Sequence, residues 1–534
     1  MNHRLFRAPA FAALTLALFA MGLPAIAQQV QRNPIVVHEL KHITTPLPFR
    51  EMKAVPWTNK SKVMREHDDG VARPHIGNVA TDAAVQSQVL AQVATTAGLN
   101  FDGVNDAQAG GFVPPDTNAS VGATQVVETV NVAYSVYDKI TGSQIMAPTN
   151  IQTLYTPLGG QCATGNVSDP IATFDKAAGR WLITMIAFNS NFSVNNSCIA
   201  ISTTSDATGT YNLYAFSYGN VLPDYPKLGV WPDAYYITTD SFKNGATVFA
   251  GAETCAMDRT NMLAGNSAIQ VCFQRSAADF ALLPADLDGA TPPPAGSPNY
   301  QMDLSTATTL NFYKFHVDFV TPANSTFTGP TKLTVPSYTD ACPTGSGKCI
   351  PQPAPGELVA AIGNRLMYRL AYRNLGDHEA MVVTHSVKPG GTGGAVSAVR
   401  WYEVRSPGST PVIFQRGTVG GGSSATARWM GSVAMDKNGD IALGYSKSST
   451  TVKPAIEYVG RIPTDPINTM ESSKQIVAGG GVQTASQGRW GDYSSMAIDP
   501  SDDCTFWYAQ EYYKTTGSFN FATRLASFKF TTCH

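Results

Sequence analysis

The chain has 534 residues, of which 43% are hydrophobic and only 14% charged, and its 37 Lys and Arg nearly balance its 39 Asp and Glu. Soluble domains carry about 25% charged residues, so this surface relies on Ser, Thr, Asn and Gly instead. The near-zero balance excludes a strongly basic chain that follows nucleic-acid phosphates, and the hydrophobic content excludes wholesale disorder. We therefore expect a folded protein with no nucleic-acid partner.

Residues 1–27 have the order of a secretory signal peptide. Basic residues near the start are followed by an apolar stretch over 8–23 and by the small-residue cleavage site Ala25-Ile26-Ala27. A membrane anchor would need about 20 uninterrupted apolar residues. No later segment approaches that length without a charge. We predict a mature chain that begins near Gln28, is secreted or periplasmic, and does not span a membrane.

Residues 28–98 differ from the rest of the chain. They contain charge clusters at 38–41 and 65–69, no Cys, and a polar Ala/Gln/Thr run over 80–97. Such composition is typical of an arm packed over a domain. We interpret the segment as an N-terminal extension or a pro-segment, with one helix around 83–97.

From about Phe101 onward, short runs of β-branched and aromatic residues alternate with Gly, Pro, Asn and Asp clusters. The runs at 126–132 and 134–137 are typical, and no apolar period of 3.6 residues is sustained. The Pro-rich segment 282–300 is interpreted as a loop. This pattern predicts an all-β domain over 99–534.

A diffuse repeat lies inside this domain. Asp175, Asp233, Asp436 and Asp499 each follow an apolar strand end and precede a polar turn and a return strand. A unit of about 50–65 residues is typical of propeller blades, and the gap between Asp233 and Asp436 would hold roughly three of them. We predict a six- or seven-bladed β-propeller with an N-terminal extension, and the alternative is a β-sandwich.

The eight cysteines all follow residue 160, and an even number in an exported chain indicates disulfides. Sequence alone allows 105 pairings of eight cysteines. Because short loops close most readily, our hypothesis is nearest-neighbour pairing, that is Cys162–Cys198, Cys255–Cys272, Cys342–Cys349 and Cys504–Cys533. No C-x-x-C is present, so a zinc site is not expected.

Four motifs together resemble a group of secreted, uncharacterised bacterial proteins. They are Pro114–Asn118, Asp224–Asp233, Tyr372–Glu379, and Arg489–Met496 running on to Asp503–Trp507. The resemblance spans residues 100–534 and implies a sialidase-like β-propeller and export. It carries over no catalytic residues, because the group has none established. The chain also departs from true sialidases, since it has no clean S-x-D-x-G-x-T-W box and no assignable arginine triad.

The densest titratable groups are Asp492 with Tyr493, and Asp377 with His378 and Glu379. A carboxylate pair from different blades would act as general acid and base, or as acid and nucleophile. Tyr493 with Glu379 would alternatively make an activated tyrosine nucleophile, and His378 or His385 with a tyrosine would suit a polysaccharide lyase. The competing interpretation is that these groups form structural ion pairs.

Arg428-Trp429 and Arg489-Trp490 each precede a repeat strand. Arginine binds carboxylates through a two-pronged contact and tryptophan stacks on sugar rings, so these pairs, together with Arg373, are candidates for binding an acidic glycan. The alternative is that the arginines and tryptophans stack on one another and join blades.

Asp116 and Asn118 offer side-chain oxygens two residues apart, with Asp102 and Asp106 nearby in sequence. Oxygens in an Asp-, Asn- and Gly-rich loop suit Ca²⁺, so Asp116 and Asn118 are candidate calcium ligands. Residues 436–440 have a similar pattern, but Asn438-Gly439 between two hydrophobic runs predicts a hairpin.

The leading functional prediction is a secreted propeller that acts on extracellular glycan as a glycoside hydrolase or polysaccharide lyase. The alternative is a non-catalytic propeller at the cell surface that binds carbohydrate or protein, and a third hypothesis is a structural surface protein. We expect a monomer whose partner is an extracellular polysaccharide or a surface protein, with Ca²⁺ as the sole candidate cofactor.

Overall fold

The computed structural model describes residues 1, 29–57, 62–63, 82–88, 90–343, 347–390, 396–421 and 425–534. Within these residues the regular secondary structure is nearly all strand. The α-helices are the short α1 (Gln152–Tyr155), α2 (Gly160–Thr164) and α3 (Arg259–Ala264), and η1 (Phe49–Glu51) and η3 (Pro322–Asn324) are single-turn 3-10 helices. The all-β prediction is confirmed. None of the described helices has the length and apolarity needed to cross a bilayer. Apart from Met1, the predicted signal peptide lies outside the described residues.

In the described chain the strands form seven successive antiparallel groups of four, each joined mainly by short turns. The first three groups are β6 (Asn118–Val121), β7 (Gln125–Val130), β8 (Ala133–Asp138) and β9 (Gln144–Asn150); β10 (Asn166–Asp175), β11 (Arg180–Phe188), β12 (Asn195–Ser202) and β13 (Tyr211–Gly219); and β14 (Leu222–Val230), β15 (Tyr235–Lys243), β16 (Val248–Met257) and β17 (Ile269–Gln274).

The fourth group is β18 (Leu283–Asp288), β19 (Asn299–Thr306), β20 (Thr309–His316) and β21 (Thr326–Thr334), and the fifth is β25 (Met367–Asn374), β26 (Glu379–Lys388), β27 (Ala398–Arg405) and β28 (Val412–Val419). The sixth is β29 (Ala427–Met435), β30 (Ile441–Ser448), β31 (Ala455–Arg461) and β32 (Lys474–Val477), and the seventh is β33 (Ser495–Ile498), β34 (Phe506–Tyr512), β35 (Ala522–Phe530) and β4 (Thr95–Asn105).

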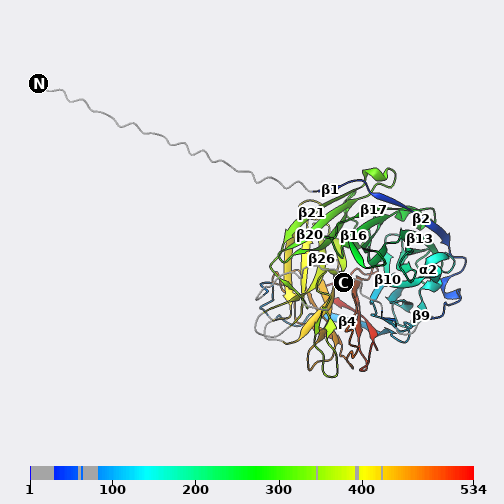
Figure 1. Ribbon diagram of the computed structural model, residues 1–534. Helices are drawn as coiled ribbons and strands as arrows, with labels where there is room; N and C mark the ends of the chain where they lie inside the picture. The colour runs from blue at the N-terminus through cyan, green and yellow to red at the C-terminus, as the bar shows by residue number, and fades with distance from the viewer. Residues whose placement is uncertain are drawn as a thin grey trace.

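The first strands of the groups form a closed ring. Each contacts the first strand of the next group, and β33 contacts β6. β18 and β25 also pair directly in parallel. In Figure 1 the chain colours pass around a disc from cyan through green and yellow to red, and the N-terminal strand β4 lies among the last, red strands. The seventh group therefore combines the two ends of the domain.

The repeat inferred from sequence corresponds to real structural positions. Asp175 and Asp436 are at or just after the last residues of the first strands β10 and β29, and Asp499 follows β33. The predicted hairpin at 436–440 joins β29 to β30. Two groups, not three, lie between Asp233 and Asp436 in the described chain. The long connection from β21 to β25 takes up part of the intervening residues. The Pro-rich segment 282–300 is not wholly a loop, since it contains β18 and the first residues of β19.

The N-terminal segment runs along the outer edges of the groups. β1 (Val30–Gln31) pairs with β21, and β2 (Ile35–Thr44) pairs with both β17 and β13. Further on, Val85 bridges Thr418 of β28, and β4 completes the last group beside β35. Exposed sheet edges are sites for unwanted strand pairing, so this segment protects several of them.

The helix predicted around 83–97 is absent from the described residues there, which form turns, isolated bridges and the start of β4. Pairing with the neighbouring sheets replaces helical hydrogen bonds. Asp82, at the beginning of this stretch, is buried and forms an ion pair with Arg400 of β27. Whether residues 28–98 are removed as a pro-segment stays a prediction.

The remaining strands are short pairs beside the ring. β3 (Lys62–Val63) pairs with β5 (Phe112–Val113), β22 (Thr339–Asp340) pairs with β26, and β23 (Lys348–Ile350) pairs with β24 (Val359–Ala360). The predicted disulfide pairing is confirmed in full, with bonds Cys162–Cys198, Cys255–Cys272, Cys342–Cys349 and Cys504–Cys533.

The hydrophobic core lies between neighbouring groups. Trp231 after β14, Tyr300 of β19 and Tyr372 of β25 pack edge-on in one cluster that joins three groups. Burial of such large aromatic side chains is a main source of stability in sheet packing. The middle of the ring is also filled, because Arg369 of β25 donates to the Met496 carbonyl of β33 at 2.9 Å and pairs with Asp286 and Asp288 of the adjacent strand β18. A cavity of only about 20 Å³ remains there.

Candidate functional site

The ring of first strands has two chemically different ends. The first strands run in one direction, because residues at their beginnings contact one another, as Asp116 N–H does with the Gly491 carbonyl at 3.0 Å and Ser494 Oγ with the Met430 carbonyl at 3.0 Å. We call the end where these strands begin the upper end, and the end where they finish the lower end. Along β10, the six residue steps from Asp169 to Asp175 span about 20 Å.

Six buried polar residues lie together at the upper end. We call them the upper cluster, and they are Asp116, Asp169, Lys227, Arg489, Asp492 and Tyr493. Arg489 Nη2 donates to both carboxylate oxygens of Asp492 at 2.7 Å. Asn131 Nδ2 donates to Asp116 Oδ2 at 2.9 Å, while Asp116 Oδ1 is buried without a hydrogen-bond partner in the described chain. The side chains of Arg489 and Asp492 keep 9% and 12% of their exposure, so solvent still reaches the cluster.

The backbone at the upper cluster explains how the carboxylates converge. Asp116, Asp169 and Asp492 all have positive φ, at 47°, 51° and 86°. Aspartate is among the few residues that tolerate this left-handed region. Each sharp turn occurs just before its first strand or at an irregularity within it, and it places the carboxyl at the upper end of the ring.

Burial and mutual proximity set the protonation of these acids. Burial, followed by the neighbouring carboxylates of Asp492 and Asp169, raises the pKa of Asp116 well above its ordinary value. Burial likewise raises the pKa of Asp169, although Lys227 opposes the shift. Two charged carboxylates so close together repel each other. The protonated form of one of them is therefore favoured.

Lys227 and Tyr493 complete the upper cluster. The Lys227 ammonium lies 3.4 Å from the ring centre of Tyr225 and 4.1 Å from that of Tyr493, and it donates to the Pro226 carbonyl at 2.9 Å. Burial lowers the pKa of Lys227 to about 8, against the opposing attraction of Asp169 and Asp116. Burial also raises the pKa of Tyr493 well above its ordinary value, and its hydroxyl has no hydrogen-bond partner in the described residues.

Two of the sequence candidates for catalysis, Asp377 and Glu379, are not brought to Asp492 and Tyr493. They lie in the hairpin from β25 to β26, at the lower end of β25, whereas Tyr368 near the beginning of that strand contacts Tyr493. Glu379 accepts a hydrogen bond from Tyr372 at 2.7 Å. Asp377 is exposed and pairs with His378.

The predicted Arg–Trp pairs are mostly interior. Trp429 and Trp490 are fully buried and their rings lie 5.5 Å apart, so they join the sixth and seventh groups. The alternative stated from sequence was stacking of arginine on tryptophan, whereas here the two tryptophans contact one another. Arg428 lies over the ring of Tyr445. Neither tryptophan presents an indole face to solvent for a sugar.

The calcium hypothesis at Asp116 and Asn118 is not supported by gathered ligands. Asn118 Oδ1 accepts the Ala172 N–H at 2.9 Å, and Asp102 is engaged at the outer edge by Arg524 and Lys514. Among the described residues, acidic and sulfur groups meet at metal-ligand distance only around Glu253, where both partner cysteines form a disulfide. The site stays a prediction.

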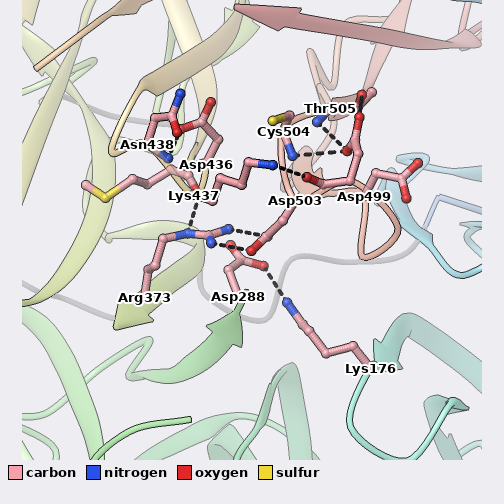
Figure 2. A network of polar contacts seen from close by, with 12 residues as sticks. Lys176, Asp288, Arg373, Asp436, Lys437, Asn438, Asp499, Asp503, Cys504 and Thr505 are labelled. Carbon is pink, nitrogen blue, oxygen red and sulfur yellow. Dashed lines mark hydrogen bonds and ion pairs between the residues drawn. The ribbon is translucent and has the colours of Figure 1, made fainter. Parts of the chain in front are cut away.

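At the lower end, carboxylates are paired with cations or backbone (Figure 2). Arg373, a predicted binding residue, donates two hydrogen bonds to Asp503 at 2.7 and 2.8 Å and a third to the Met435 carbonyl. Lys139 donates to Asp499 at 2.8 Å. Lys176 contacts Asp288 more weakly, at 3.5 Å. Most of these groups are arranged to hold turns together.

Sequence reasoning did not single out Asp169 or Lys227. Lys227 lies in the Asp224–Asp233 motif, and Asp169 precedes a run of β residues, so the available signal was a polar residue at the start of each inner strand. This signal identifies a site only when the closed ring shows that the beginnings of the first strands converge.

No protein-family model matches the chain, and no curated protein matches it. Among solved structures it is similar to an α-L-arabinofuranosidase of Fusarium graminearum (10% identity over 82% of this chain and 99% of that one, TM-score 0.37). It is also similar to a Hadza microbial sialidase (10%, 77% and 64%, TM-score 0.34) and to the WD40 domain of SCAP from fission yeast (9%, 76% and 82%, TM-score 0.31). TM-scores below 0.5 establish no shared fold, so the architecture rests on the strand pairing itself.

Proposed function

We propose that the seven groups are the blades of a seven-bladed β-propeller, and that the protein is a secreted glycoside hydrolase whose active site is the upper cluster. The observation that supports this best is the unequal environment of two neighbouring acids. Burial and adjacent carboxylates keep a proton on Asp116, whereas Asp492 is in an ion pair with Arg489. Two neighbouring acids, one held protonated and the other held charged by its surroundings, are suited to general acid and general base roles.

In the proposed reaction Asp116 donates its proton to the glycosidic oxygen as the bond from that oxygen to the anomeric carbon breaks. Asp492 takes a proton from the attacking water, or attacks the carbon itself, and the new bond forms on the anomeric carbon. Arg489 holds the Asp492 carboxylate in place through both oxygens. The Lys227 ammonium, which lies over the Tyr493 ring, supplies positive charge beside Asp169 and Asp116.

A hydrolase fits this geometry better than a lyase. A lyase based on His378 or His385 would need one of them beside a tyrosine in an accessible site. His385 does contact Tyr402 at 3.0 Å, but it is fully buried and burial lowers its pKa well below the ordinary value. His378 lies in the lower-end hairpin beside Asp377.

The test is digestion of acidic and neutral polysaccharides by the purified mature protein, with products identified by mass. We expect oligosaccharides that have gained one water per cleavage. Asp492→Asn should lower the rate by about 10²- to 10⁴-fold, because a positioned acid or base contributes that much. Asp499→Asn is the matched control and should keep the rate. Asp499 directly follows β33, the strand that Asp492 precedes.

Intact polymers with every substrate would overturn the proposal. Retention of one polymer without cleavage would favour the non-catalytic binding propeller instead. An unchanged rate for Asp492→Asn would remove the upper cluster from the mechanism, and products lighter by one water would indicate a lyase.

A further inference from the structure

A second concave site lies at the lower end, apart from the upper cluster. It is a pocket of about 380 Å³ formed where β10, β14 and β18 finish and where the chain leaves β33. We call it the lower pocket. This volume is in the range of sites that hold one small molecule. The filled middle of the ring, occupied by Arg369 and its partners Asp286 and Asp288, separates it from the upper cluster.

The walls of the lower pocket are mainly apolar. Pro232, Leu287, Pro292 and Pro500 line it from three different groups, together with Trp231. Proline rings and aliphatic side chains present rigid C–H surfaces that pack against the faces of compact rings. Leu287 belongs to β18, and Pro232 and Pro500 closely follow β14 and β33, whereas Pro292 lies in the connection from β18 to β19. Strand ends therefore fix most of these walls without a ligand.

The charged side chains around the lower pocket differ in how closely they are paired with opposite charges. Asp175 is held by Arg259 at 2.7 Å and by the Tyr235 hydroxyl at 2.8 Å. Asp503 receives two hydrogen bonds from Arg373. Lys176 has a single contact at 3.5 Å to Asp288, an acid that already pairs with Arg369. Lys176 is therefore the cation whose charge is least compensated.

Burial acts on the same lysine. Its side chain keeps 16% of its exposure, and burial lowers its pKa below the ordinary value even though Asp288 opposes this. A largely buried ammonium whose nearest anion is 3.5 Å away gains from a further anion that approaches to hydrogen-bond distance. The lower pocket thus combines an under-compensated cation with apolar walls.

We propose that the lower pocket binds a small carboxylate with a compact ring as its body, the carboxylate contacting Lys176 and the ring lying between the proline-lined walls. Two kinds of molecule share this chemistry, a uronic acid released from a glycan and an aromatic or alicyclic acid. The inference does not depend on hydrolytic activity at the upper cluster.

Isothermal titration calorimetry at low salt with D-glucuronate and with benzoate tests the proposal, and D-glucose and benzyl alcohol serve as uncharged counterparts. At least one acid should bind, more tightly than its uncharged counterpart. Preference for glucuronate would identify a sugar acid as the ligand class, and preference for benzoate an apolar ring. Failure of both acids to bind would overturn the proposal.

Lys176→Met keeps the length of the side chain and removes its charge, and Asp288 remains paired with Arg369 in this variant. We expect it to weaken binding of the acid at least tenfold, the size of one charge-assisted hydrogen bond. Lys243→Met, at the upper end of β15 in the group that supplies Pro232, is the matched control and should bind as the wild type does. Equal affinity for Lys176→Met and wild type would contradict the assignment.

A second variant keeps the test decisive if Lys176→Met does not fold. Ala177 lines the lower pocket from an exposed turn, so a larger side chain there fills the pocket without entering the core. Ala177→Phe should abolish binding of both acids. Undiminished binding by this variant would place the ligand elsewhere.

Discussion

The two ends of the ring use similar residues with opposite results. At the lower end Asp503 accepts hydrogen bonds from both Nη atoms of Arg373, and Asp499 accepts one from Lys139. At the upper end Asp116 has a buried oxygen with no hydrogen-bond partner in the described chain, and nearby carboxylates raise its pKa. Most lower acids stabilise turns, although burial and the neighbouring Asp440 raise the pKa of Asp436 there to about 8. The upper acids are held together against their mutual repulsion.

This difference is what we expect if the upper cluster is the active site proposed above. Local arrangements that weaken the fold persist where activity needs them, and arrangements that satisfy every group persist for stability. We infer that the upper cluster is maintained at a cost in folding free energy, while the lower network contributes to it. Neutralising Asp116 in the upper cluster and neutralising Asp503 in the lower network should therefore shift stability in opposite directions.

The largest expected effect comes from the covalent link at the lower end. Cys504–Cys533 ties the turn after Asp503 to the C-terminus and has a sequence separation of 29. Removing it in the double variant Cys504→Ser/Cys533→Ser should lower the free energy of unfolding by about 3 to 4 kcal/mol, from the entropy of the freed loop. Guanidinium titration measures the change.

Cys342–Cys349 is the matched comparison for that experiment, because Cys342 follows β22, which pairs with the last residues of β26 at the upper end. Cys342–Cys349 has a sequence separation of only 7, so its removal should lower the free energy of unfolding by about 2.5 kcal/mol. A larger loss there than at Cys504–Cys533 would contradict the view that the lower end is the better anchored of the two.

The next effect concerns the ion pair of Arg373. Asp503→Asn leaves that guanidinium buried, with only 4% of its side chain exposed, and without its charged partner. We expect the free energy of unfolding to fall by about 3 kcal/mol, the usual result of breaking a buried pair from one side. Asp377→Asn, which changes an exposed acid in the hairpin after the same strand, should leave stability unchanged. Equal effects of the two substitutions would show that burial of Arg373 does not matter.

The sequence predicted features that depend on local chemistry. Runs such as 126–130 form strands because their β-branched residues suit a pleated, buried surface, and the disulfides follow from short loops. β4 was not predicted, because Thr95–Asn105 lacks regular alternation and becomes a strand by pairing with β35.

The upper cluster depends on closure of the ring. Asp169, Lys227 and Asp492 belong to three different groups, and nothing local to any of them indicates the other two. The expected pairing of Tyr493 with Glu379 failed for the same reason, since the direction of β25 places Glu379 at the lower end. Residue type identified candidates, and only the closed ring shows which of them meet.

The most direct test of the central claim is the pH dependence of stability in Asp116→Asn. The pKa of Asp116 is raised in the folded state, so between the ordinary and the raised value the unfolded chain binds fewer protons and wild-type stability falls as pH increases. The asparagine keeps an acceptor for Asn131 and cannot ionise. We predict equal stability near pH 4 and a variant more stable by about 1 kcal/mol at neutral pH, where one pKa unit is worth about 1.4 kcal/mol. A variant less stable than wild type at neutral pH, as expected of Asp503→Asn, would contradict the account.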